Sequence, residues 1–164
     1  MPVSALANLA ALPGVAFVEA AIQAYVPDTP APTEGDVGAL SSVGSQGGAA
    51  SNAGAWHTAG YTGAGVKIAV LDDFRDLALA QAAGEVPAVT TYGTLTTGSR
   101  HGTAVVEIIH DMAPNAQITV ASPLTVVQFA SMVSDLVSQG NRIISSPIYF
   151  PGEEPGDGTG VASQ

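Results

Sequence analysis

The sequence contains no cysteine, few basic residues and no long hydrophobic run. Without cysteine the chain has no disulfide, no thiolate nucleophile and no cysteine-ligated zinc. Its basic residues are Lys67, Arg75, Arg100 and Arg142, which are scattered along the sequence. Nucleic acids and anionic membranes bind clustered Lys and Arg side chains, so neither is an expected partner. A membrane-spanning helix needs about 18 or more consecutive apolar residues, and none is expected here.

The composition is acidic and apolar at the same time. Fourteen acidic residues against four basic ones give a net charge of −10, yet only 11% of the residues are charged and 46% are hydrophobic. A disordered polyanion has the opposite balance, with many charges and few apolar side chains. The 164 residues also fall within the roughly 100–200 residues of a typical domain. The chain is therefore expected to fold around a hydrophobic core.

The N-terminal quarter differs in pattern from the rest. Apolar residues recur at helical spacing up to Leu12 and are followed by Pro13 and Gly14, after which residues 15–25 are rich in β-forming side chains. Residues 27–50 carry Pro, Gly, Ser and Asp without periodicity, as in a linker. We therefore divide the chain into an end segment (1–26), a linker (27–50) and a main domain (51–164). The apolar N-terminus lacks a basic residue and makes a poor signal peptide, so any export signal is expected outside this chain.

Helical and strand patterns alternate in the main domain. A short helix capped by Ser51 or Asn52 comes first. The expected strands then cover residues 66–71, 86–92, 118–121 and 142–145, and the expected helices cover residues 76–83, 103–112 and 125–139. Strands that alternate with helices form a mostly parallel sheet covered on both faces. The predicted fold class is α/β.

Two polar residues stand where such a sheet binds ligands. Asp72 directly follows the apolar strand 66–71, and His101 lies where a loop enters a helix. Open α/β sheets bind ligands at the carboxyl ends of their strands. The positive end of a helix dipole disfavours the imidazolium ion, and a neutral imidazole can act as a general base. A neighbouring carboxylate would hold its tautomer. Asp72 and His101 are therefore the candidate catalytic residues.

Both residues lie in blocks that resemble a known family. Residues 59–72 read AGYTGAGVKIAVLD and residues 101–105 read HGTAV. The two blocks, in this order, resemble the subtilisin-like serine proteases (subtilases). The resemblance places the catalytic aspartate at Asp72 and the catalytic histidine at His101. It implies a subtilisin-like three-layer parallel-sheet fold, an endopeptidase activity and a peptide or protein substrate.

The end segment carries a looser resemblance. Residues 12–19 read LPGVAFVE and are similar to the last helix-to-strand segment of a subtilase propeptide. In the family such a segment precedes a linker and then the catalytic domain. The resemblance as a whole extends over residues 50–148 and, more loosely, over residues 1–26.

The sequence also departs from the family pattern. Asp73 and Phe74 follow the catalytic aspartate where the family has Thr or Ser and then Gly. Asp73 is expected to cap the turn after the strand. Pro147 stands in the segment where the family's substrate-lining strand ends, and proline has no N–H to donate to a substrate.

The block that carries the nucleophile is the largest departure. No Gly-Thr-Ser-Met-Ala motif and no oxyanion-hole asparagine motif occurs, and Ser145, Ser146 and Ser163 lack that context. Aspartate and histidine without a serine have nothing to deprotonate. The resemblance therefore implies part of a subtilase, inactive by itself, with an incomplete sheet. It also implies an extracytoplasmic location and no cofactor for the chemistry.

Other readings of the same residues stay open. A non-catalytic, protease-derived module would bind peptides or a partner without cleaving them. A phosphoryl-accepting receiver domain also has paired acids after a strand, but it needs a later lysine and Lys67 comes before the acids.

Three further patterns have ordinary explanations. Glu107 and His110 have a spacing found in di-metal helix bundles, but one copy favours a solvated helix face. The glycines at 63 and 65 precede their strand, whereas a dinucleotide loop follows one. Glu153, Glu154 and Asp157 offer oxygen ligands for a structural calcium ion, but they form no recognisable ligand pattern, and a solvated loop is the favoured explanation.

Overall fold

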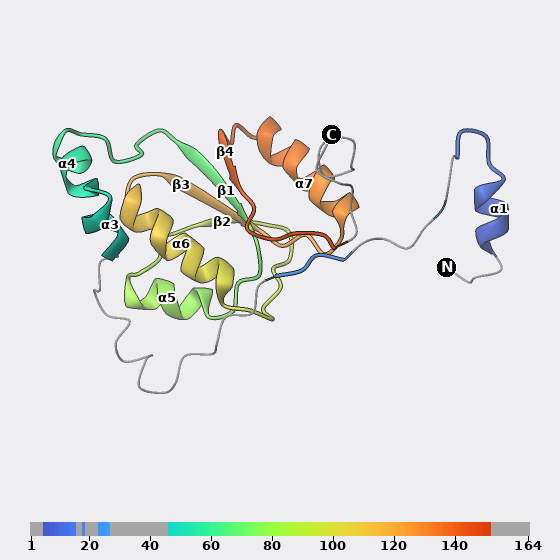
Figure 1. Ribbon diagram of the computed structural model, residues 1–164, viewed down its shortest axis with the longest axis horizontal. Coiled ribbons are helices and arrows are strands. Elements are labelled where there is room, and N and C mark those ends of the chain that lie inside the picture. The colour runs from blue at the N-terminus through green and yellow to red at the C-terminus, as the bar shows by residue number, and fades with distance from the viewer. Residues whose placement is uncertain (1–4, 16–17, 19–22, 27–45, 152–164) are drawn as a thin grey trace.

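A four-stranded parallel sheet forms the centre of the fold. The computed structural model describes residues 5–15, 18, 23–26 and 46–151. All strand pairs are parallel, and their order across the sheet is β2-β3-β1-β4 (Figure 1). The strands are β1 (Lys67–Leu71), β2 (Thr90–Tyr92), β3 (Gln117–Ala121) and β4 (Ile143–Ser145). The expected α/β class with a parallel sheet is confirmed.

Six helices accompany the sheet in the described part of the chain. They are α1 (Leu6–Ala10), α3 (Gln46–Ala50), α4 (Ala53–Thr58), α5 (Leu77–Ala83), α6 (His101–Met112) and α7 (Val126–Ser138). Helix α7 lies within the expected range 125–139, and the side chain of its N-cap Thr125 accepts a hydrogen bond from Gln128 N. Helix α1 buries none of its residues.

Two helix boundaries differ from the sequence-based expectation. Helix α3 forms at the end of the stretch that was expected to be aperiodic, and Ser51 Oγ donates a hydrogen bond to the Gly47 carbonyl at 2.7 Å. Helix α6 begins at His101, two residues before the expected start at Thr103. Because Gly102 has little helix propensity, the sequence pattern placed this start too late.

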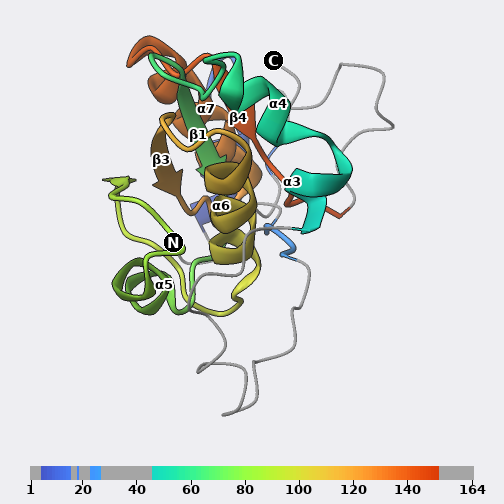
Figure 2. The ribbon, with the colours of Figure 1, turned by 90° about the vertical axis from the view of Figure 1, so that its left-hand side faces the viewer.

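Alternate residues of β1 pack against opposite layers of helices. Val70 lies in a buried cluster with Val106 of α6 and Ala80 of α5. Ala69 and Leu71 lie in a second cluster, whose α7 member is Leu136. Successive side chains of a strand point to opposite faces, so α5 and α6 cover one face and α7 covers the other. Figure 2 shows α6 in front of the sheet and α7 behind it.

The strand order places the carboxyl end of β1 at a switch in direction. The chain passes from β1 to β2 and β3 on one side, and then to β4 on the other side of β1. Leu71 at the end of β1 pairs with Ala121 at the end of β3, and Tyr92 at the end of β2 also pairs with Ala121. Such a switch point is the usual ligand site of an open α/β sheet. Asp72 is the next residue after β1.

Among the helices that the structure describes, none has the length and apolar character needed to cross a bilayer.

The two faces of α7 provide a test of the packing. Leu136 is fully buried, whereas its neighbour Val137 is 54% exposed. We expect Leu136→Ala to lower the free energy of unfolding by about 2–5 kcal/mol through the lost transfer energy and the cavity. The matched variant Val137→Ala should change it by less than about 0.5 kcal/mol. Urea unfolding followed by circular dichroism measures both. Equal effects would contradict the assigned orientation of α7.

Candidate functional site

Asp72 and His101 form a direct contact. Asp72 lies beyond the end of β1 and is 2% exposed, and His101 is the first residue of α6. His101 Nδ1 lies 2.7 Å from Asp72 Oδ2. The structure thus brings together the two residues that the sequence patterns single out.

The Asp72 carboxyl group is held on both of its oxygens. Oδ1 accepts a hydrogen bond from the Asp73 N–H at 2.7 Å, while Oδ2 faces the imidazole. Burial raises the pKa of Asp72, and the bonds from Asp73 N–H and His101 lower it in part. The main chain is fixed as well, since Asp72 N donates to the Ala121 carbonyl and Ser122 Oγ donates to the Asp72 carbonyl at 2.6 Å. This carboxyl group has one orientation, directed at the imidazole.

The contact determines which imidazole nitrogen carries the proton. With Asp72 ionised, a neutral His101 donates from Nδ1, and its Nε2 then holds the lone pair. The His101 side chain is 22% exposed, and no hydrogen bond of Nε2 is found within the described residues. A histidine oriented by a carboxylate, with its other nitrogen open, is arranged for general-base chemistry.

Gly102 allows α6 to start this close to β1. A Cβ atom at Gly102 would lie 2.6 Å from Asp72 Cβ, 2.7 Å from the Asp73 carbonyl oxygen and 2.9 Å from Phe74 Cε1. Gly102 N also donates to the Asp73 carbonyl at 3.0 Å. A larger residue would push the first turn of α6 away from β1. The glycine of the HGTAV block is therefore required by the Asp–His distance itself.

Phe74 ties the turn after Asp72 to the core. Its side chain is 2% exposed and belongs to the cluster under α5 and α6. Its main-chain N donates to the Thr96 carbonyl at 2.8 Å. The turn after Asp72 is thus tied to the core and to the loop that leads to His101.

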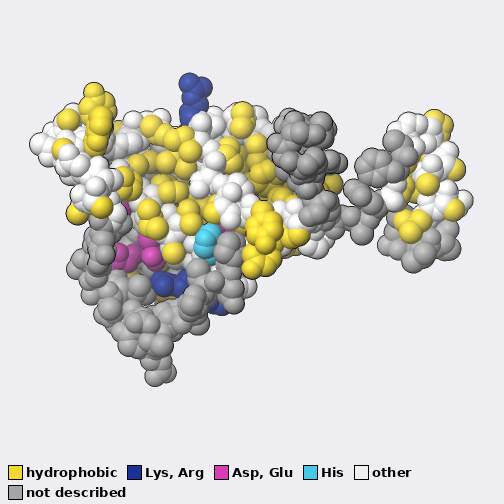
Figure 3. All heavy atoms as spheres, in the orientation of Figure 1, with side chains coloured by type: hydrophobic (Ala, Val, Ile, Leu, Met, Phe, Trp, Pro, Cys, Tyr) yellow, Lys and Arg dark blue, Asp and Glu magenta, His cyan; other side chains and the backbone are white. Residues whose placement is uncertain are grey.

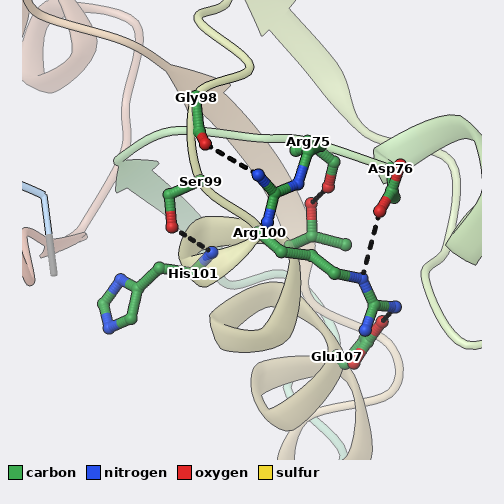
Figure 4. A network of polar contacts seen from close by, with 8 residues as sticks. Arg75, Asp76, Gly98, Ser99, Arg100, His101 and Glu107 are labelled. Atoms are coloured by element: carbon green, nitrogen blue, oxygen red, sulfur yellow. Dashed lines mark hydrogen bonds and ion pairs between the residues drawn. The ribbon is translucent and has the colours of Figure 1, made fainter. Parts of the chain in front are cut away.

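The side chain of Arg100, the residue before His101, is directed away from the imidazole ring. Figure 4 shows the imidazole on one side of the start of α6 and the Arg100 guanidinium group on the other. Arg100 forms ion pairs with Asp76 at 3.7 Å and with Glu107 at 3.4 Å. Burial raises the pKa of Glu107, and Arg100 partly offsets this. Asp72 is therefore the carboxyl group that acts on the imidazole.

The Glu107 and His110 spacing does not build a metal site. Glu107 is engaged with Arg100. No group of three or more His, Asp or Glu side chains suited to hold a metal ion occurs within the described residues. The possible calcium ligands Glu153, Glu154 and Asp157 lie outside the described residues.

An extended segment of residues 23–26 lies beside the Asp72 carboxyl group. Gln23 forms an antiparallel bridge with Thr125, and Tyr25 forms one with Tyr149. Ala24 N donates to the Leu124 carbonyl at 3.0 Å, and Tyr25 N donates to the Tyr149 carbonyl at 2.8 Å. The segment is thus held between the chain after β3 and the chain after β4. Sequence patterns favoured extended structure here but gave no indication of its partners.

This segment and the two aspartates line one cavity of about 360 Å³. Val26 lines it from the extended segment, Asp72 and Asp73 from the end of β1, and Leu124 and Ile148 from the segments on either side. His101 is not among the lining residues. Figure 3 shows one face of the molecule, on which hydrophobic side chains form much of the surface and charged side chains are few. At the carboxyl edge of the sheet, the chain's own residues 23–26 thus lie extended in a groove beside Asp72 and Asp73.

Pro147 does not prevent strand pairing in this groove. Tyr149, two residues later, supplies both partners: its N–H donates to the Tyr25 carbonyl at 3.2 Å and its carbonyl accepts from Tyr25 N. The two tyrosine rings also pack, with centroids 4.7 Å apart.

The serines near the pair have other partners. Ser122 Oγ donates to the Asp72 carbonyl, and Ser99 Oγ accepts from the His101 main-chain N–H at 3.1 Å. Ser145 lies in β4 opposite Val70. No hydrogen bond joins a serine hydroxyl to the His101 ring in the part of the chain that the structure describes. Ser163 lies outside that part.

Gly102 gives the sharpest steric prediction. We expect Gly102→Ala to displace the start of α6 and to break the Asp72–His101 contact, with a loss of about 1–3 kcal/mol from overpacking. Gly54 is the control, because a Cβ there meets nothing within 4 Å, and Gly54→Ala should raise stability by up to about 1 kcal/mol. Urea unfolding and the His101 ring NMR signals measure the two effects. An unchanged His101 signal in Gly102→Ala would contradict the steric argument.

Burial of Asp72 predicts a pH dependence of stability. Burial raises the pKa of Asp72 in the folded state above its value in the unfolded state. The folded state therefore binds the carboxyl proton more tightly, and the free energy of unfolding falls as the pH rises from the unfolded-state pKa to the folded-state pKa. We expect Asp72→Asn to match the unaltered chain in unfolding free energy near pH 3 and to be more stable near pH 8, since carboxyl groups titrate from about pH 4. Urea unfolding at both pH values tests this. An Asn variant that is less stable at the higher pH would contradict it.

No protein-family model matches this chain and no curated protein matches it.

Proposed function

We propose that the chain is part of a subtilisin-like serine endopeptidase, with Asp72 and His101 as two members of its catalytic triad. The observation that carries the proposal is the 2.7 Å contact between Asp72 Oδ2 and His101 Nδ1. It joins two separate sequence blocks at the switch point of a parallel sheet, where α/β enzymes place their chemistry. The sheet would then be the first part of a larger subtilisin-like sheet.

In the proposed reaction His101 moves one proton between oxygen and nitrogen. Its Nε2 takes the hydroxyl proton of a serine as that oxygen attacks the substrate carbonyl, and then gives the proton to the leaving amine. Asp72 keeps Nδ1 as the donor and stabilises the imidazolium ion. The serine in this proposal lies outside residues 1–164, so the chain alone is inactive.

The groove supports a peptide or protein as the substrate. Main-chain hydrogen bonds hold residues 23–26 from both sides, at Leu124 and at Tyr149. Such bonds recognise any extended peptide, whatever its side chains. An endopeptidase that binds its substrate in this way needs no resident cofactor, and an extracytoplasmic location fits the family.

A peptide-binding module without catalysis is the second candidate. The same groove favours it, because strand pairing with residues 23–26 requires neither Asp72 nor His101. It predicts binding without cleavage, even for a product of the gene that extends beyond Gln164.

The two candidates differ in peptide hydrolysis. The 164-residue chain should neither cleave peptides nor react with a fluorophosphonate probe, whereas the product of the complete reading frame should do both. In that product we expect kcat to fall roughly 10⁴-fold for Asp72→Asn and on the order of 10⁶-fold for His101→Ala. The matched variant Asp76→Asn changes the charge close to Arg100 and should leave kcat nearly unchanged.

Two outcomes would contradict the proposed peptidase. Probe labelling of the 164-residue chain would show that the nucleophile is already present. A complete product that binds peptides but does not cleave them would replace the peptidase by the binding module.

A further inference from the structure

Asp73, the residue after Asp72, binds the loop that immediately precedes His101. Asp73 is 7% exposed, and its carboxyl group receives two main-chain hydrogen bonds. Gly98 N donates to Oδ1 at 2.9 Å and Ser99 N donates to Oδ2 at 2.7 Å. Asp73 was expected to cap the turn that follows its own strand. Its carboxyl group instead binds a loop far along the sequence, just before α6.

Ser99 connects the Asp73 carboxyl group to His101, because it contacts both residues. Ser99 Oγ accepts the main-chain N–H of His101 at 3.1 Å (Figure 4). The Ser99 carbonyl in turn accepts from Arg75 N at 2.8 Å. A shift of the Asp73 carboxyl group would therefore move Ser99, and with it the first residue of α6.

The main chain of Asp73 contacts Asp72 and Gly102, the residue after His101. Its N–H donates to Asp72 Oδ1 at 2.7 Å, and its carbonyl accepts from Gly102 N at 3.0 Å. One residue thus fixes the Asp72 carboxyl group by its N–H, the first turn of α6 by its carbonyl and the preceding loop by its side chain. Only the last of these can be removed by a side-chain substitution.

The loop before His101 is also bound through its carbonyl groups, since Phe74 N donates to the Thr96 carbonyl and Arg75 N donates to the Ser99 carbonyl, both at 2.8 Å. Gly98 carries no side chain, and a Cβ there would lie 2.7 Å from Asp73 Oδ2. Arg75 contributes one side-chain bond, from Nη1 to the Gly98 carbonyl at 2.9 Å. A carboxylate that accepts two N–H groups binds more strongly than a neutral acceptor, and the Asp73 side chain accepts the main-chain N–H groups of both Gly98 and Ser99.

We propose that the Asp73 carboxylate is a positioning residue, which sets the Asp72–His101 contact by anchoring Gly98 and Ser99. Asp73 touches neither the imidazole nor a reacting atom. The importance of this geometry for catalysis rests on the proposed function, but the positioning itself is measured on the pair without any activity.

The test is the exchange with water of the proton on His101 Nδ1, followed by NMR in chain labelled with ¹⁵N-histidine. We expect Asp73→Ala to speed this exchange about tenfold or more, as the loss of a charge-assisted hydrogen bond allows. The Gly98 and Ser99 amide protons should exchange faster in the same variant. Asp73→Asn retains one acceptor oxygen and should lie between Asp73→Ala and the unaltered chain.

Asp76→Asn is the matched control. It removes an equal charge from the same loop region, where Asp76 faces Arg100, but leaves the bonds to Gly98 and Ser99 intact. The Nδ1 exchange rate should stay within about twofold of the unaltered chain, since separated sites act independently. Ser99→Ala removes the hydroxyl group that accepts the His101 main-chain N–H, and it should reproduce part of the increase in Nδ1 exchange expected for Asp73→Ala.

Three outcomes would overturn the proposal. In the first, Asp73→Ala and Asp73→Asn fold and expose the Gly98 and Ser99 amides, yet leave Nδ1 exchange unchanged. In the second, Asp76→Asn speeds the exchange as much as Asp73→Ala, so that charge alone is responsible. In the third, neither Asp73 variant folds, which would make the carboxylate a determinant of the fold. A complete product that lacks peptidase activity would refute the proposed function and leave this result unaffected.

Discussion

The close approach of α6 to the end of β1 is the constraint on which the site depends. Gly102 allows it, because any Cβ there would collide with Asp72, Asp73 and Phe74. The Asp73 carbonyl then binds Gly102 N at 3.0 Å, and His101 Nδ1 reaches Asp72 Oδ2 at 2.7 Å. Interiors are too closely packed to absorb a displaced helix. The chemistry of the pair therefore follows from a steric condition at a neighbouring glycine.

The groove follows from the same edge of the sheet. Parallel strands end together, so the segments after β3 and β4 leave on either side of Asp72, and residues 23–26 lie between them. Exposed tyrosine rings at 25 and 149 pack on each other across this pairing. Although the chain as a whole is acidic, the two carboxyl groups at this edge each accept hydrogen bonds from main-chain N–H groups. The orienting carboxylate and the groove that holds residues 23–26 thus lie at one sheet edge.

The sequence predicted the parts of this arrangement that depend on local pattern. The apolar run of β1 and the helix that follows Thr125 were predicted from periodicity and are present in the structure. The motif blocks singled out Asp72 and His101, whose side chains the structure brings within 2.7 Å of each other. The two-acceptor role of Asp73 was not predictable, since its partners Gly98 and Ser99 are distant in sequence and bind through main-chain atoms. Neither was the pairing of Tyr25 with Tyr149, because main-chain hydrogen bonds leave no side-chain signature. Helix α6 was predicted to begin late, since a glycine that is required by packing reads as a helix breaker.

The claim at the centre of this account is that Asp72 holds His101 with its Nε2 available as a base. The most direct measurement is the two-bond ¹H–¹⁵N correlation spectrum of the His101 ring in the unaltered chain near pH 8, where an ordinary histidine of pKa about 6.5 is neutral. The account predicts the Nδ1–H tautomer, with an unprotonated Nε2 and an Nδ1 proton protected from water. A ring protonated at Nε2, or one that exchanges freely between both tautomers, would contradict it.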